Sequence, residues 1–273
     1  MRLVLLFGGF TSAGALLAAR SLGLKVALHE ANSAPGLTNR WLYRLAHRVY
    51  LGDGTAAVSF PRVQTRVVGV PVRPDLAGLA ATRLDRGPRR PARVLVLGSS
   101  TASQFLDARA PELLARLRAL GCDVEAWHQV GDGDAGAVQS AYRELAIPAR
   151  VDGFIDDIAE AYAWGDVAVT RAGAVTLAEL AVVGLPSFVV PLARASEDHQ
   201  VANARAFATA VDWVREADWR TEEVAARLAA ILKNRSAWTE SAHSIARLAR
   251  PDAAAALVAD CMKLLDRHPE PRP

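Results

Sequence analysis

Six short segments of this sequence carry the glycines and polar side chains that could do chemistry, and each follows an apolar run. They combine hydroxyl, carboxylate and amide groups with glycine turns, which suits hydrogen bonding to phosphate and sugar groups. One of them contains the acidic pair Asp156 and Asp157, which could bind a metal or cap the helix that follows. The six segments are residues 8–14, 29–32, 98–101, 154–157, 170–174 and 196–200.

The elements that must position these segments alternate between strand and helix. Apolar runs such as 1–7, 25–30, 93–98 and 167–171 are each followed by a stretch with helical character. Continuous apolar strands between helices indicate parallel sheets that are covered on both faces. In such sheets, ligands bind beyond the carboxyl ends of the strands, where the polar segments fall. This pattern predicts a two-lobed α/β protein that binds a phosphate or a nucleotide.

Proline usage suggests where the two lobes divide. Five of the 14 prolines lie between Pro61 and Pro91, and an arginine-rich run closes this stretch. Because proline fixes φ and removes a hydrogen-bond donor, we interpret the stretch as a linker. The first lobe then has about three strands and the second five or six. The expected divisions are a partial N-terminal domain at 1–75, a linker at 76–92, a second domain at 93–250, and a C-terminal helix and tail at 251–273.

Composition excludes several classes of protein. The net charge of +3 is too small to imply binding to nucleic acid. Two cysteines make no disulfide framework, and the six histidines have no metal-ligand spacing. The apolar run that opens the chain ends at Gly8-Gly9, far short of the roughly 20 residues of a membrane-spanning helix. We therefore expect a soluble or peripheral protein without a metal or another cofactor.

Several ordered motifs resemble the MurG group of glycosyltransferase family 28, which transfers N-acetylglucosamine from UDP-N-acetylglucosamine to a lipid-linked peptidoglycan precursor. The resemblance implies a GT-B fold of two doubly wound Rossmann-like domains, with the N-terminal one incomplete. It also implies an inverting, metal-independent transfer at the cytoplasmic face of the inner membrane. The motifs are residues 29–32 (HEAN), 36–40 (GLTNR), 71–75 (PVRPD), 154–162 (FIDDIAEAY), 171–179 (RAGAVTLAE) and 198–204 (DHQVANA).

The resemblance assigns the substrate UDP-N-acetylglucosamine to named positions. Ile155 would present backbone groups to uracil, and Glu179 would accept hydrogen bonds from the ribose hydroxyls. Gln200, with Asp198 nearby, would contact the hydroxyls of N-acetylglucosamine. The diphosphate would lie against Ser100 and a helix N-terminus at Ala174, Val175 and Thr176, with positive charge from Arg73. Asn32 would contact the donor from the N-terminal lobe. No catalytic residue is assigned.

The sequence also departs from the family pattern. The family's first glycine loop, Gly-Gly-Thr-Gly-Gly-His, has no counterpart, and the chain corresponds to the family from the second loop onward. We therefore expect an N-terminally truncated chain. The lost loop would contact the acceptor, the lipid-linked muramoyl-pentapeptide. This leaves a transferase, a UDP-sugar-binding half-enzyme that needs a partner, or, less favoured, a UDP-N-acetylglucosamine 2-epimerase of the same fold.

Several single residues keep alternative interpretations. His199 is a positioned polar contact or a base, and Arg73 is a phosphate ligand or a linker arginine. The basic, aromatic stretch 40–48 would contact an anionic membrane, or form a helix that buries Trp41 and Leu45 in the core. Thr221 is expected to cap a C-terminal helix.

Overall fold

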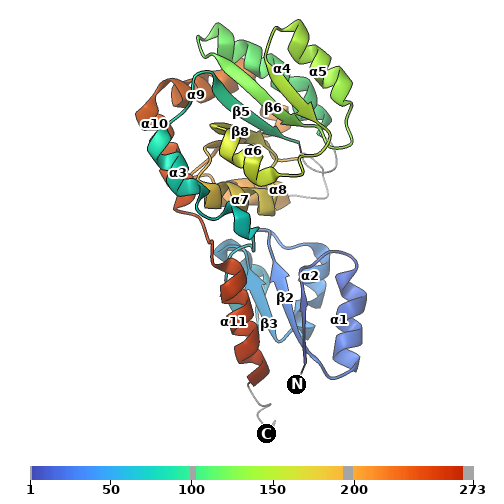
Figure 1. Ribbon diagram of the computed structural model, residues 1–273. Coiled ribbons are helices and arrows are strands. Elements are labelled where there is room, and N and C mark those ends of the chain that lie inside the picture. Colours follow the sequence, from blue (N-terminus) through green and yellow to red (C-terminus); the bar gives the residue numbers. More distant parts are fainter. Residues whose placement is uncertain (1, 99–102, 193–198, 267–273) are drawn as a thin grey trace. The chain divides into compact units, whose positions relative to one another are not determined.

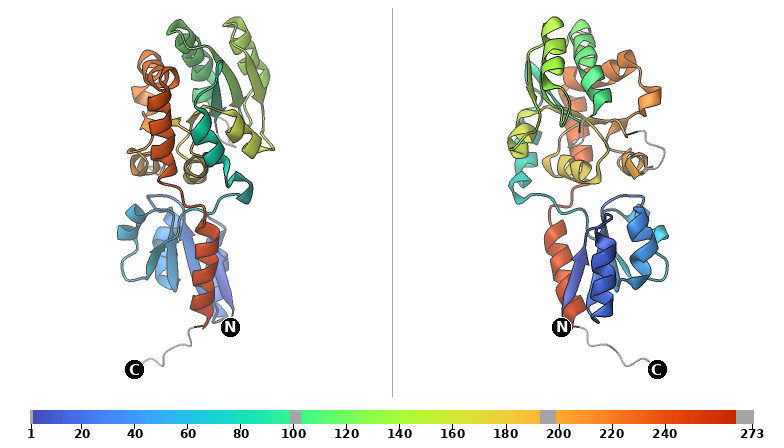
Figure 2. Two further views of the ribbon diagram at one scale, coloured as in Figure 1. Left: turned by 60° about the vertical axis from the view of Figure 1, so that its left-hand side comes forward. Right: turned by 90° about the vertical axis from the view of Figure 1, so that its right-hand side faces the viewer.

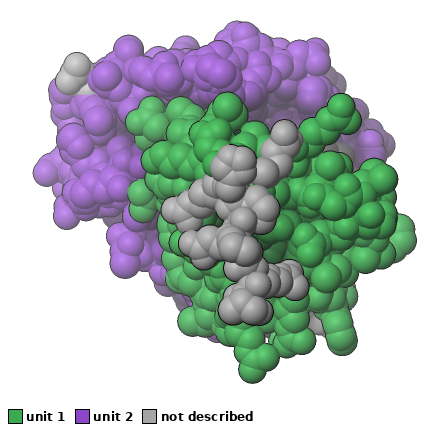
Figure 3. Space-filling view, turned by 90° about the horizontal axis from the view of Figure 1, so that it is seen from below, with its two compact units in different colours: residues 1–72, 250–273 green, residues 73–249 purple. Residues whose placement is uncertain are grey.

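The computed structural model describes residues 2–98, 103–192 and 199–266 and divides the chain into two compact units. Unit 1 comprises residues 1–72 together with 250–273, and unit 2 comprises residues 73–249 (Figure 3). The C-terminal helix therefore belongs to the same unit as the N-terminal sheet. Each unit has a parallel sheet and its own hydrophobic core, so the α/β fold class predicted for both lobes is confirmed.

Unit 1 contains a four-stranded parallel sheet in the order β1-β2-β3-β4 (Figure 1). Parallel pairing needs a crossover after each strand, and helices or 3-10 turns supply it here. The strands are β1 (Leu3–Leu6), β2 (Lys25–Glu30), β3 (Arg48–Leu51) and β4 (Thr65–Val67), and the helices are α1 (Ser12–Ser21), α2 (Leu37–Leu42) and α11 (Ala253–Asp266), with 3-10 turns η1 (Tyr43–Leu45) and η2 (Gly54–Ser59).

The sheet of unit 1 is buried on both faces because successive side chains of a strand point to opposite sides. In β2, Val26 and Leu28 pack with Leu16 of α1 in one core cluster. Ala27, between them in sequence, packs with Leu257 of α11 in another. The right-hand view of Figure 2 shows the strands of this unit between α1 and α11. The apolar residues Val26–Leu28 were therefore the correct sequence signal for β2, although the buried His29 and Glu30 continue it.

A buried ionic cluster attaches α11 to the sheet. Asp260 of α11 is 3% exposed and accepts hydrogen bonds from Arg48 and Arg66. The Tyr50 hydroxyl donates to the same carboxylate over 3.0 Å. Arg48 belongs to the basic, aromatic stretch 40–48, whose arginines were expected to face a membrane or solvent. It instead lies buried on β3, because the Asp260 carboxylate compensates its charge.

Unit 2 contains a six-stranded parallel sheet in the order β10-β9-β8-β5-β6-β7. Five or six strands were expected. The strands are β5 (Ala92–Leu97), β6 (Val124–Gln129), β7 (Ala149–Asp152), β8 (Val167–Thr170), β9 (Ser187–Val189) and β10 (Asp212–Trp213). The helices are α3 (Leu79–Arg86), α4 (Gln104–Ala119), α5 (Ala135–Glu144), α6 (Ile158–Trp164), α7 (Ala174–Val183), α8 (His199–Ala206), α9 (Thr221–Lys233) and α10 (Arg235–Ala246), with 3-10 turns η3 (Pro74–Leu76) and η4 (Glu216–Asp218).

The core of unit 2 follows the same alternation. Val94 and Val96 of β5 pack in one cluster with residues of α4, α5 and α9. Leu95 points to the opposite face, where α6 packs against β5. An added Cβ on Gly165, which ends α6, would lie 3.2 Å from the Leu95 Cβ. Glycine is therefore required there for the close approach of helix and strand.

Three expectations about single elements are corrected. The proline-rich stretch contains β4 and α3, because the prolines leave residues 75–87 free to form a helix. The chain divides at Val72/Arg73, and α3 belongs to unit 2, so this stretch is more than a linker. Arg220, rather than Thr221, is the N-cap of α9, and the Thr221 hydroxyl accepts from the Trp219 indole instead.

Candidate functional site

The strands of unit 2 bring most of the expected site residues to one edge of the sheet. β5 and β8 are parallel neighbours, with Leu97 paired to Thr170 at their carboxyl ends. Chain segments leading into α4 and α7 start at this edge. Because a parallel sheet places all its carboxyl ends together, the helix N-termini that follow gather there as well.

The first turn of α7 holds Ala174, Val175 and Thr176. Gly173 is the N-cap in an extended conformation, with ψ of 135°, and Val175 is half exposed. The first N–H groups of a helix have no carbonyl partner within the helix and carry partial positive charge. The expected helix N-terminus at these positions is present, and it can bind a phosphate group.

Glu179 lies within α7, past this first turn, and contacts a buried tyrosine. The Tyr162 hydroxyl of α6 donates to Glu179 Oε2 over 2.8 Å. Burial raises the pKa of the Glu179 carboxyl, while the hydrogen bond from Tyr162 and the charge of Arg73 lower it. Tyr162 was not among the expected site residues. A tyrosine inside an apolar helix is usually a core residue, so its type and spacing gave no signal.

The segment before α6 places Ile155 between β7 and that helix. Ile155 is buried, whereas Phe154 beside it is exposed. Asp157 caps α6, with its Oδ1 accepting from the Glu160 N–H over 3.0 Å. Of the two interpretations of the acidic pair, helix capping is therefore what Asp157 does. Within the described parts of the chain, no three His, Cys, Asp or Glu side chains gather as they would around a metal ion.

Gln200, in the first turn of α8, has its amide fixed in one orientation. Its Oε1 accepts from the backbone N–H of Ala172 over 3.1 Å and of Leu192 over 2.9 Å. With Oε1 occupied twice, the amide nitrogen is the group left to face a ligand. The side chain of Gln200 is therefore oriented to offer a ligand a hydrogen-bond donor, which the sequence alone did not specify.

Arg73 does not present a free charge. Its guanidinium forms hydrogen bonds of 2.6 to 3.2 Å with the Asp75 carboxylate in η3, and both side chains are about half exposed. The nearby Asp75 carboxylate raises the pKa of Arg73, and Asp157 and Glu179 add to this effect. The positive charge of Arg73 is thus balanced by acidic neighbours, Glu179 among them.

Asn32 belongs to unit 1, where Glu30 organises its surroundings. The backbone N–H and the side-chain amide of Asn32 both donate to Glu30 Oε1, over 2.9 and 3.1 Å. Glu30 Oε2 accepts from Gly36 N–H and from the Asn39 amide. Glu30 is buried, and it fixes the turn that carries Asn32. Ser100 and Asp198 lie outside the described residues.

Arg171 is a second organising residue that was not assigned a role. Its Nε donates to Ser103 Oγ over 2.9 Å, and its Nη1 donates to the Val190 carbonyl and forms an ion pair with Glu216. Ser103 in turn caps α4. Arg171 therefore connects the segments that follow β5, β8 and β9. A buried arginine needs such partners, so burial would have identified it where residue type did not.

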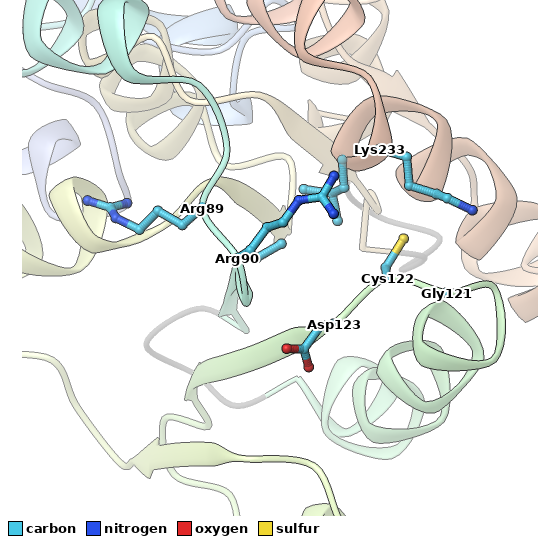
Figure 4. Close-up of a pocket in the computed structure, with 8 residues that line it drawn as sticks. Arg89, Arg90, Gly121, Cys122, Asp123 and Lys233 are labelled. Atoms are coloured by element: carbon cyan, nitrogen blue, oxygen red, sulfur yellow. The ribbon is translucent and has the colours of Figure 1, made fainter.

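A separate hollow of about 190 Å³ lies at the opposite end of the strands, where β5 and β6 begin. Figure 4 shows Arg89 and Lys233 directed to different sides of it. Arg89 pairs with Asp166, and Lys233 donates to the Leu120 carbonyl over 2.8 Å. Since these two cations are engaged in contacts that support the fold, the hollow is not assigned as the donor site.

Comparisons with known proteins agree on one family. The model of the glycosyltransferase family 28 C-terminal domain matches residues 93–257, and that of the N-terminal domain matches residues 1–51. A UDP-N-acetylglucosamine–N-acetylmuramyl-(pentapeptide) pyrophosphoryl-undecaprenol N-acetylglucosamine transferase of Nitratidesulfovibrio vulgaris (strain Hildenborough) is 40% identical, over 99% of this chain and 74% of its own length. The protein of the same name from Chromohalobacter salexigens is 42% identical, over 96% and 72%.

Solved structures give the same result. The crystal structure of MurG from Acinetobacter baumannii superimposes with a TM-score of 0.80 and 30% identity, over 96% of this chain and 74% of that one. The crystal structure of a putative UDP-N-acetylglucosamine 2-epimerase from Listeria monocytogenes superimposes with a TM-score of 0.71 at only 12% identity, over 99% of this chain and 76% of that one. The second likeness shows a shared fold and carries no statement about activity.

Proposed function

Since the chain belongs to glycosyltransferase family 28, we propose that it transfers N-acetylglucosamine from UDP-N-acetylglucosamine to N-acetylmuramyl-(pentapeptide) pyrophosphoryl-undecaprenol. One arrangement in unit 2 carries this proposal. The helix start at Ala174–Thr176, the anchored carboxylate of Glu179 and the oriented amide of Gln200 provide, respectively, a phosphate site, a hydroxyl acceptor and a hydroxyl donor. These three chemistries are those that a nucleoside diphosphate sugar requires.

Each part of the donor has a group of matching chemistry. The backbone of Ile155 would bind uracil, and Glu179 would accept from the ribose hydroxyls. The N–H groups of Ala174, Val175 and Thr176, with Ser100, would bind the diphosphate. Gln200 would donate to a hydroxyl of N-acetylglucosamine, and Asn32 would contact the donor from unit 1.

The reaction balances without a covalent enzyme intermediate. The acceptor hydroxyl oxygen would attack C1 of the sugar while the bond from C1 to the UDP oxygen breaks, which inverts the configuration at C1. The hydroxyl proton leaves to a base, and UDP departs with the bonding electrons. The N-terminus of α7 carries about +0.5 of an elementary charge and would stabilise the negative charge that develops on UDP. No residue is assigned as the base.

A surface of unit 1 has the composition of a peripheral membrane contact, and we propose that it binds anionic lipid at the cytoplasmic face of the inner membrane. Trp41 is 77% exposed and lies one helical turn from exposed Leu37 on α2. Arg40 and Arg44 are exposed beside them. Leu45 is 37% exposed, so the alternative in which Trp41 and Leu45 fill the core is wrong. Among the described helices, none is long and apolar enough to span a membrane.

A transfer assay tests the enzymatic proposal. The chain is incubated with UDP-N-acetylglucosamine labelled in the sugar, together with the lipid-linked acceptor, and label in the lipid product is measured. We expect product in proportion to enzyme, and its loss in the Glu179→Ala variant. Donor binding without any transfer would instead support the half-enzyme that needs a partner. Failure to bind UDP-N-acetylglucosamine would refute both.

Vesicle sedimentation tests the membrane proposal. We expect binding to vesicles that contain phosphatidylglycerol, weak binding to pure phosphatidylcholine, and loss of binding in Trp41→Ala. Met262→Ala is the matched control, because Met262 is an exposed apolar residue on α11, which covers the opposite face of the same sheet. Equal binding by both variants and the parent chain would contradict the assignment of this surface.

A further inference from the structure

We propose that Tyr162 is a positioning residue for donor recognition, whose hydroxyl orients the Glu179 carboxylate so that the site selects a ribonucleotide over a 2′-deoxyribonucleotide. This inference rests on the proposed function, since it concerns the ribose of the UDP donor. The Tyr162 hydroxyl holds one oxygen of the Glu179 carboxylate and leaves the other available for the ribose.

The two carboxylate oxygens of Glu179 are in different situations. Oε2 accepts the Tyr162 hydroxyl over 2.8 Å. Among the described residues, Oε1 has no hydrogen-bond partner, and it is not one of the buried polar atoms without a partner. Oε1 therefore remains open to solvent. The pair thus presents one anchored oxygen and one free acceptor, which is what recognition of a sugar hydroxyl needs.

The Tyr162 hydroxyl is suited to this role because its own state is fixed. The side chain is 1% exposed, and burial raises the pKa of its hydroxyl well above the ordinary value, with the nearby Glu179 charge acting in the same direction. The phenol therefore stays protonated over the neutral pH range and donates its hydrogen. Without this bond, the flexible Glu179 side chain would populate several rotamers, and binding a hydroxyl would require it to be ordered.

A different residue holds the helices together. The buried Arg83 guanidinium donates to the Tyr162 and Gly165 carbonyls at the end of α6 and to the Val183 carbonyl at the end of α7, the last over 2.9 Å. These contacts do not involve the Tyr162 hydroxyl. Removal of that hydroxyl should therefore leave α6 and α7 in place and change only the orientation of the carboxylate.

The experiment compares the affinity of the full chain for UDP with its affinity for 2′-deoxy-UDP by isothermal titration calorimetry. We define the discrimination ratio as the dissociation constant for 2′-deoxy-UDP divided by that for UDP. This ratio reports the contribution of the 2′-hydroxyl and cancels general effects on folding. We expect Tyr162→Phe to reduce this ratio by about fivefold, since a hydrogen bond to a charged group is lost from the network. The ratio in the double variant Tyr162→Phe/Glu179→Ala should equal that in Glu179→Ala.

Tyr142→Phe is the matched control. Tyr142 is also a buried tyrosine of unit 2, and its hydroxyl forms a 3.1 Å hydrogen bond with His128 Nδ1. Its loss should leave the ratio unchanged. A second perturbation, Glu179→Asp, retains the charge but shortens the side chain. It should also lower the ratio, because the carboxylate can no longer reach both Tyr162 and the ribose.

The outcomes separate this inference from the proposed function. If Glu179→Ala lowers the ratio and Tyr162→Phe does not, the positioning role is wrong and the donor site stands. If neither variant changes the ratio, the assignment of Glu179 to the ribose fails as well. Failure of the parent chain to bind UDP would overturn both. A similar loss in Tyr142→Phe would show a general effect of removing a buried hydroxyl and would overturn the positioning role.

Discussion

Replacement of Asp260 by asparagine should loosen unit 1 without affecting unit 2. The Asp260 side chain is 5% exposed and compensates the charge of Arg48, whose side chain is 8% exposed. Its other ionic partner, Arg66, is 45% exposed and contributes little. Removing one partner of a buried pair typically costs about 3 to 5 kcal/mol. We expect the lower end, about 3 kcal/mol, because asparagine still accepts a hydrogen bond and Arg48 keeps its contact with Gln64.

Hydrogen exchange followed by mass spectrometry measures this loss of stability peptide by peptide. A single unfolding curve would mix the contributions of the two units. A loss of about 3 kcal/mol corresponds to roughly 100-fold faster exchange in peptides that cover β2 and β3. Peptides that cover β5 should be unchanged. Asp266→Asn is the control, because Asp266 is exposed on the same helix. Unchanged protection of β2 and β3 in Asp260→Asn would refute the stabilising role of the cluster.

The same cluster predicts a pH dependence. Burial alone would raise the pKa of the Asp260 carboxyl, but hydrogen bonds from Arg48, Arg66 and Tyr50 outweigh it, so the pKa lies below its ordinary value. A carboxyl with a lowered pKa stabilises the fold above the unfolded-state pKa of about 4, and this contribution is lost as the pH falls through the folded-state pKa. Protection of β2 and β3 should therefore decrease below about pH 4, and less so in Asp260→Asn.

Three further predictions concern the donor site. Because burial raises the pKa of Glu179, the affinity for UDP should fall on acidification at a higher pH than for an ordinary glutamate, and calorimetry from pH 5 to 8 should show this loss reduced in Glu179→Gln. Gln200→Leu should reduce the preference for UDP-N-acetylglucosamine over UDP, since it removes the donor amide; an unchanged preference would contradict that role. In Gly98→Ala, an added Cβ would lie 3.1 Å from the Ser103 Cβ and 3.2 Å from the Gln129 carbonyl oxygen. We expect this crowding to reduce the free energy of unfolding by about 1 kcal/mol, which lowers the melting temperature by roughly 2 to 4 °C. Gly153→Ala, where the nearest atom to an added Cβ is the Gly131 carbonyl oxygen at 3.6 Å, is its control in the same unit.

The sequence predicted the strands that are buried on both faces. Lys25–Glu30 was expected with the same bounds as β2, since a continuous apolar run between helical stretches has few other solutions. Short or polar strands were harder. β4 has three residues, two of them exposed, and β3 begins with the buried Arg48, so neither has the apolar pattern of β5 or β8. Their positions depend on tertiary contacts that no local pattern reports.

Some residues of the candidate site were likewise predictable from local motifs, and others depend on tertiary contacts. Motifs indicated the start of α7, Glu179 and Gln200, because these residues occur together in a recognisable order. Tyr162 and Arg171 were missed, since their roles come from hydrogen bonds across elements that are distant in sequence. The acidic pair and the Trp41 stretch each had two interpretations; a contact shows that Asp157 caps α6, and exposure contradicts the interpretation in which Trp41 and Leu45 fill the core.

The measurement that tests the central claim most directly is calorimetric titration of the full chain with UDP-N-acetylglucosamine, compared with Glu179→Gln. The substitution keeps the shape of the side chain and removes the charge that would accept the ribose hydroxyls. The change from a charged to a neutral acceptor weakens each of two hydrogen bonds by about 1 kcal/mol, which predicts roughly 30-fold weaker binding in the variant. Saturable binding by the parent chain with this loss would support the donor site. Equal affinity in both proteins, or no binding by the parent chain, would contradict it.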